Sequence, residues 1–129
     1  MRYLSVDELL LIHFELIRCF GGTKSLRDFG LLHSAAERPK ASFAGQDLYL
    51  SVFDKAAALL HSLIFNHPFF DGNKRTAFTA TARFLYLNGH IINATQGDLV
   101  DYLLSTFKSR PTIDQIALWL KQHTKTAKP

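Results

Sequence analysis

Two adjacent stretches of this sequence are apolar on nearly every side of a helix, so the fold has to bury two whole helices. The first runs from about residue 47 to 65 and ends before Pro68. The second runs from about residue 72 to 87 and is stopped by Asn88 and Gly89. A helix that is apolar all round lies in the interior of a domain. We therefore expect the segment between these helices to be held rigidly by packing at both ends.

Helical patterns also cover most of the remaining chain. Ser5 and Glu8 form a capping box that opens the first helix, and Gly21 and Gly22 stop it. Further helices are predicted over residues 30–38, 95–107 and 112–123. An extended loop or small flap is expected over residues 40–46, and a short extended piece over residues 90–94. The sequence thus predicts an all-α bundle of about six helices.

The length and composition fit one globular domain. A chain of 129 residues supports a single core, which we place over residues 1–124, followed by a flexible basic tail over residues 125–129. No signal sequence opens the chain, and no apolar run approaches the roughly 18 residues of a membrane span. Cys19 is the single cysteine, which excludes an intramolecular disulfide. We expect a buried thiol at Cys19 and a soluble, cytoplasmic protein.

The net charge is +4, which favours an acidic partner such as a nucleotide, a nucleic acid or an acidic protein surface. Direct nucleic-acid binding is not expected, because the basic residues are scattered and no stacking aromatics alternate with them. The histidines outside the central segment show no pair at zinc-ligand spacing, and we interpret them as core or surface residues.

The segment between the two interior helices carries the chemistry, and it reads His-Pro-Phe-Phe-Asp-Gly-Asn-Lys-Arg-Thr over residues 67–76. It places Lys74 and Arg75 in the opening turn of a helix, where unpaired N–H groups already carry partial positive charge. Two cations there are unfavourable unless an anion is bound. The pattern therefore predicts a phosphate site.

The residues around this site allow more than one role. His67 is a candidate general base, or its ring caps the last carbonyls of the preceding helix. Asp71 is a good N-cap and also a carboxylate of the kind that Mg²⁺ needs. Gly72 either lets the backbone approach phosphate or simply forms a turn. Phe69 is expected to anchor the loop in the core.

The remaining three residues are candidates for phosphate contact. Arg75 has a planar fork suited to two phosphate oxygens. Asn73 caps the helix or binds phosphate, and Lys74 is a phosphate ligand, a gate on the pocket or a solvated lysine.

Residues 67–76 closely resemble the signature of the Fic and Doc superfamily, and the Asn-Lys-Arg-Thr ending matches its Doc (death-on-curing) branch. Upstream, residues 27–32 together with Ala35, Arg38 and Pro39 also resemble the Doc pattern. The resemblance covers roughly half the chain and implies a Fic-like helical fold. It further implies that His67 is the general base, that Asp71 holds Mg²⁺, and that residues 72–75 bind the phosphates of ATP.

The same resemblance implies a toxin of the Doc type. Fic relatives that transfer AMP carry Gly in place of Lys74 and a second Arg in place of Phe78. In the Doc branch these changes accompany transfer of the ATP γ-phosphate to a Ser or Thr hydroxyl of a translation factor, EF-Tu, which blocks translation. A Fic-type AMP or nucleotidyl transferase is the alternative reading. A non-catalytic phosphate- or partner-binding domain is the second alternative.

Restraint of the activity is expected from another chain. None of the glutamates Glu8, Glu15 and Glu37 has a Ser or Thr four positions earlier, as the inhibitory helix of Fic proteins requires. Likeness to Doc implies a Phd-like antitoxin that orders a partly disordered segment on the toxin.

Overall fold

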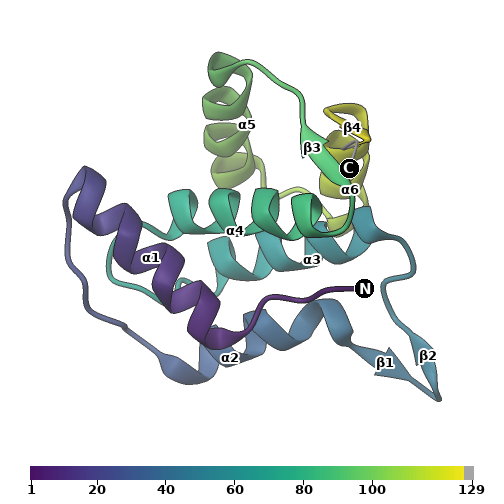
Figure 1. The fold of residues 1–129 in the computed structure, drawn as a ribbon, viewed down its shortest axis with the longest axis horizontal. Helices are drawn as coiled ribbons and strands as arrows, with labels where there is room; N and C mark the ends of the chain where they lie inside the picture. The colour runs from purple at the N-terminus through teal and green to yellow at the C-terminus, as the bar shows by residue number, and fades with distance from the viewer. Residues whose placement is uncertain (127–129) are drawn as a thin grey trace.

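Two central helices that run side by side in opposite directions organise the molecule (Figure 1). The computed structural model describes residues 1–126, and in it these helices are α3 (Val52–Phe65) and α4 (Asn73–Leu87). Most of α3 is buried. Ser51 caps α3 through a capping box with Asp54, which corrects the predicted start near residue 47. Both predicted helices are present, and α3 is an interior helix as expected. Helix α4 is buried on one side only, which corrects the prediction that it is interior all round: it exposes a face made of Arg75, Thr79, Arg83 and Tyr86.

The first part of the chain covers one side of this pair. Helix α1 (Val6–Phe20) starts with the predicted capping box at Ser5 and packs on α4, and α2 (Phe29–Glu37) packs on α3. Pro39 ends α2, and the chain continues as a 3₁₀ turn, η1 (Arg38–Lys40).

A small hairpin forms the predicted flap. Strands β1 (Ser42–Phe43) and β2 (Gln46–Asp47) pair antiparallel, with Ser42 opposite Asp47. The buried ammonium of Lys55 on α3 donates to Asp47 Oδ2 at 3.0 Å and to the Tyr49 carbonyl at 2.6 Å. One lysine of the core therefore holds the base of the hairpin.

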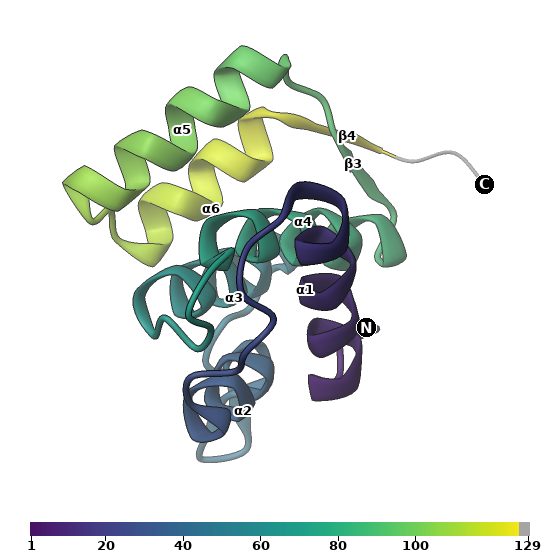
Figure 2. The same ribbon diagram turned by 90° about the vertical axis from the view of Figure 1, so that its left-hand side faces the viewer.

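The last part of the chain covers the other side of the central pair (Figure 2). Helices α5 (Gln96–Ser109) and α6 (Ile113–Gln122) lie side by side, and α6 packs on α3. Strand β3 (His90–Ile92) pairs antiparallel with β4 (Thr124–Thr126). The predicted tail over residues 125–129 therefore starts too early, because Lys125 lies in β4 opposite Ile91. The last three residues of that predicted tail lie outside the described residues.

The hydrophobic core lies between the central helices α3 and α4 and the elements that cover them on either side, and Cys19 is not part of this core. On α1 the inward positions are Leu9, His13 and Ile17, which are four residues apart. Cys19 follows Ile17 by two positions, which turns it to the opposite face, and it is exposed. The prediction of a buried thiol is thus wrong. None of the helices between residues 1 and 126 combines the length and apolar character needed to span a membrane.

Candidate active site

The loop that joins α3 to α4 has a fixed and partly strained backbone. His67 has a φ of 53°, which is uncommon for a residue with a side chain, and Gly72 has a φ of 77°. Phe69 is 1% exposed and stacks on the His13 ring with centroids 3.6 Å apart. The prediction that Phe69 anchors the loop is confirmed.

The Asn73 side chain forms hydrogen bonds to the main chain of the loop. Its Oδ1 accepts from the Phe69 N–H at 3.0 Å, and its Nδ2 donates to the Phe69 carbonyl at 2.8 Å. The side chain is buried, and both ends of its amide are used by Phe69. The structure therefore assigns this side chain to the loop, which corrects its predicted role as helix cap, since the N-cap is Gly72. Its predicted phosphate contact stays a prediction.

The connector between α1 and α2, residues 21–28, runs antiparallel along the loop. Leu26 and Phe69 form an isolated β-bridge, and the Phe70 N–H donates to the Ser25 carbonyl at 3.4 Å. The Arg27 N–H donates to the Pro68 carbonyl at 2.8 Å. Sequence reasoning missed this pairing, because nothing in either segment alone indicates a strand partner about forty positions away.

His13 is a site residue that sequence reasoning also missed. Its Nε2 lies 2.8 Å from the Asp71 carbonyl oxygen, so Nε2 carries the hydrogen and donates it. Burial lowers the pKa of His13, while the hydrogen bond and the charge of Asp71 act in the opposite direction. A signal was present, since His13 stands between Leu9 and Ile17 on the inward face of α1.

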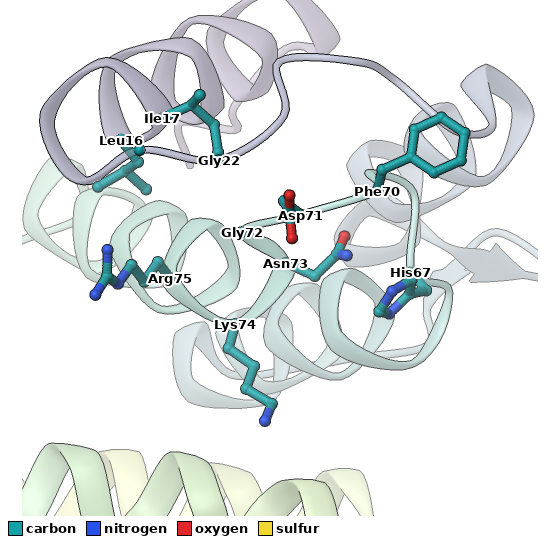
Figure 3. Close-up of a pocket in the computed structure, with 11 residues that line it drawn as sticks. Leu16, Ile17, Gly22, His67, Phe70, Asp71, Gly72, Asn73, Lys74 and Arg75 are labelled. Atoms are coloured by element: carbon teal, nitrogen blue, oxygen red, sulfur yellow. The ribbon is translucent and has the colours of Figure 1, made fainter.

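A cavity of about 350 Å³ opens beside the loop (Figure 3). The end of α1 and the following turn form one wall with Leu16, Ile17, Gly21 and Gly22. The other wall comes from the loop and the first turn of α4. It contains all six residues predicted for the site, His67, Asp71, Gly72, Asn73, Lys74 and Arg75.

The basic side chains surround the first turn of α4. In Figure 3, Arg75 and His67 lie on opposite sides of this turn, and Lys74 lies between them. The Arg75 guanidinium packs over the Phe20 ring at 4.2 Å from its centroid and is exposed. Lys74 is half-buried. The turn therefore combines two cations with the positive end of a helix dipole next to one cavity.

Asp71 is not the helix cap. The N-cap position belongs to Gly72, which makes no side-chain cap, and Asp71 Oδ2 instead accepts from the Thr23 N–H at 3.0 Å. This corrects the predicted capping role.

The Asp71 carboxylate is exposed at the cavity, and its one hydrogen bond leaves it with further lone pairs for a hard cation. Because Mg²⁺ is often held by one or two carboxylates plus phosphate oxygens and water, the residue present fits that ion. Among residues 1–126 no group of three or more His, Cys, Asp or Glu side chains gathers as a metal cluster.

Both the backbone conformation at position 72 and the atoms around it favour a glycine. Its φ of 77° favours glycine, and a Cβ at this position would lie 3.3 Å from Ile17 Cδ1 and 3.6 Å from His13 Nε2. The close approach that the structure displays is to α1. Its predicted phosphate contact stays a prediction.

Comparison with known proteins agrees with this architecture. A model of the Fic/DOC family matches residues 3–85. A protein named Toxin Doc from Mycolicibacterium smegmatis is 54% identical over 70 residues, which is 54% of this chain and 54% of that protein. A protein named Protein kinase doc from Escherichia phage P1 is 33% identical over 89 residues, which is 69% of this chain and 70% of that protein. The match thus spans about half the length of the first relative and about two thirds of the second.

The family model covers α1 to α4 and therefore includes the strained loop, its connector and both walls of the cavity. The chain belongs to the Fic/Doc family, within its Doc branch.

Proposed function

We propose that this protein is the toxin of a toxin–antitoxin pair and a protein kinase of Doc type that acts in the cytoplasm. It transfers the γ-phosphate of ATP to a Ser or Thr hydroxyl of a protein target. One observation carries the proposal: a single cavity borders His67, Asp71 and Arg75 at the N-terminus of α4. The name of the phage P1 relative, Protein kinase doc, supports phosphoryl transfer over the alternatives.

The reaction needs a base, a phosphate cradle and a fixed geometry. His67 takes the proton of the target hydroxyl, whose oxygen forms a bond to the γ-phosphorus. The bond between that phosphorus and the β–γ bridging oxygen breaks, and ADP leaves. The transition state of such a transfer is loose, so positioning and charge neutralisation contribute most of the catalysis.

The phosphates lie, in this proposal, against the first turn of α4. The leading N–H groups of a helix have no acceptor within the helix and bind anions. Arg75 contacts phosphate oxygens through its fork, and Lys74 adds a second positive charge. Asp71 would hold Mg²⁺, which would supply charge neutralisation on the phosphates.

The target and the partner come from the resemblance. We propose EF-Tu as the protein that is phosphorylated and a Phd-like antitoxin as the chain that restrains the activity. The net charge of +4 favours acidic partners in general and does not choose among them.

The deciding experiment measures the intact mass of EF-Tu after incubation with this protein and Mg-ATP. A phosphoryl increment that disappears with His67→Ala and persists with His33→Ala supports the kinase. His33 is an exposed histidine on α2 and controls for loss of an imidazole elsewhere. An adenylyl increment assigns nucleotidyl transfer instead. Unmodified EF-Tu, with growth inhibition unaffected by His67→Ala, favours the non-catalytic binding reading.

The antitoxin is tested by expressing the protein together with the product of its neighbouring gene. Co-purification of the two chains, with loss of phosphoryl transfer in the complex, supports the proposed restraint. A lone protein that is active and harmless on expression contradicts it.

A further inference from the structure

The backbone of the proposed base is held in an unfavourable conformation. His67 has a φ of 53°, in the left-handed region that residues with a Cβ seldom adopt. Pro68 follows it and narrows the choice of backbone angles further. Such a conformation persists only where the surroundings fix it, and it is typical of functional sites.

The side chain of Arg27 supplies that fixation. Its Nε donates to the His67 carbonyl at 2.6 Å, and one of its terminal nitrogens donates to the Asn66 carbonyl at 2.9 Å. These two carbonyls belong to the peptide planes on either side of the His67 Cα. With both planes held, φ and ψ of His67 are set, and so is the direction in which its Cα–Cβ bond points.

The location suits a cation. Asn66 is the C-cap of α3, so the Arg27 guanidinium lies at the negative end of that helix. The main chain of Arg27 reinforces the contact, because its N–H donates to the Pro68 carbonyl at 2.8 Å. Three successive carbonyls, those of residues 66–68, therefore bond to one residue of the connector.

We propose that Arg27 is a positioning residue that aims the His67 imidazole at the target hydroxyl. The inference rests on the proposed function of His67 as general base. Arg27 does not belong to the walls of the cavity, so it acts through the backbone of His67 and not through the nucleotide. Loss of its side chain should lower the rate of transfer and leave nucleotide binding unchanged.

Arginine is suited to this role, and lysine is not. A guanidinium presents several N–H groups in a planar fork and reaches two carbonyls at once, whereas an ammonium on a flexible stem holds them one at a time. Arg27→Lys keeps the charge and removes the fork. It should retain only part of the function, and it provides a folded variant if Arg27→Ala proves unstable.

The kinetic test compares Arg27→Ala and Arg27→Lys with the control Arg83→Ala. Arg83 is an exposed arginine on α4, and its guanidinium lies 5.9 Å from the Tyr86 ring centroid. We expect Arg27→Ala to lower kcat about 10²-fold, the loss typical of a displaced catalytic group, with KM for ATP unchanged. Millimolar guanidinium should restore part of the kcat of Arg27→Ala. A kcat that is unchanged, or a KM for ATP that rises together with the fall in kcat, overturns the proposal.

A second readout does not depend on activity. Arg27→Ala should shift or broaden the NMR signals of the His67 ring while those of the His13 ring stay in place, because His13 bonds to the other end of the loop at Asp71. If both rings change and the melting temperature falls equally in Arg27→Lys, Arg27 only ties the connector to the core and the inference is wrong. If wild-type protein transfers no phosphoryl group to EF-Tu but the His67 signals alone respond, the positioning role stands and the proposed function fails.

Discussion

At the scale of single residues, Gly72 is a position where both the backbone conformation and the neighbouring side chains favour glycine. We predict that Gly72→Ala destabilises the protein more than Gly89→Ala does. Both glycines have positive φ, 77° and 92°, so an alanine costs about 1–2 kcal/mol of left-handed strain at either. Only at position 72 does the new Cβ meet neighbours, with Ile17 Cδ1 at 3.3 Å, which adds about 1 kcal/mol or more of overpacking.

Urea denaturation of the two variants checks this prediction. A Cβ at Gly89 would have no heavy atom within 4 Å, and this glycine lies just beyond the other end of the same helix, so it isolates the backbone contribution. Equal losses of unfolding free energy in the two variants would show that the Ile17 side chain of α1 moves aside without an energetic cost. The packing argument for Gly72 would then be wrong.

The residue scale also marks the limit of what could be predicted from sequence. The residue types of the signature predicted a phosphate and metal site, and the structure gathers them around one cavity. The direction of each polar group could not be predicted. Asn73 bonds to Phe69 and Asp71 to Thr23, and these partners depend on how the loop and the connector meet.

At the scale of elements, an asparagine at each end of α4 forms hydrogen bonds to the main chain of another segment. Asn73 binds the main chain of Phe69, and Asn88 binds both the N–H and the carbonyl of Arg2 at 2.9 Å. We predict that Asn73→Ala costs about 2–4 kcal/mol, because it leaves buried Phe69 groups unsatisfied. Asn88→Ala should cost about 0.5–1.5 kcal/mol, because its bonds to Arg2 are exposed to water.

The two variants separate stability from function. Asn73→Ala should also lower phosphoryl transfer, since it frees the loop that carries His67, whereas Asn88→Ala should leave the rate unchanged. Denaturation curves and transfer rates on the same preparations give both quantities. A similar fall in rate for both would mean that the rate follows global stability and not the hydrogen bonds of Asn73 to the loop.

The flap is an element whose order depends on one buried lysine. We predict that Lys55→Met makes the bond after Phe43 more sensitive to chymotrypsin, because the bonds from Lys55 to Asp47 and Tyr49 are lost. Phe43 is 80% exposed in the hairpin and accessible to the protease. Global stability should change little, since the carboxylate that loses its partner, Asp47, is 54% exposed and is solvated by water, so no unpaired charge is left buried.

Lys40→Met is the matched control for the flap. Lys40 lies in η1 next to the hairpin, but its ammonium is exposed and faces Glu37 at 3.5 Å. Mass spectrometry of the fragments identifies the cleaved bond. Faster cleavage in both variants, or in neither, would contradict an anchoring role for Lys55.

At the scale of the whole molecule, the sequence predicted the parts whose signals are local. The capping box at Ser5 and the apolar character of α3 lie within single elements. What it did not predict comes from pairs distant in sequence. Strand β4 exists because Thr124–Thr126 meets His90–Ile92, and His13 reaches Asp71 across 58 positions.

The whole molecule should also be destabilised by mild acid, because its folded form holds two histidines neutral. Burial lowers the pKa of His13 and of His61 below the usual 6.5, and for His61 the charges of Arg38 and Arg110 lower it further. Arg38 donates toward His61 Nδ1 at 3.0 Å and has no acceptor to offer, so that nitrogen must keep its lone pair. Both rings therefore resist protonation in the folded state.

The sign of the effect follows from proton binding. Below about pH 6.5 the unfolded chain takes up protons at these histidines that the folded chain does not, so the free energy of unfolding falls as the pH falls. The loss of unfolding free energy begins near the histidine pKa of the unfolded chain and levels off only below the pKa values of the folded protein.

Urea denaturation at pH values from about 7.5 to 5 measures this loss. His61→Gln should flatten this dependence, since a glutamine oxygen still accepts from Arg38 and cannot titrate, whereas the exposed control His33→Gln should preserve it. A dependence that is as steep in His61→Gln as in the wild type would mean that acid acts on the molecule through other groups.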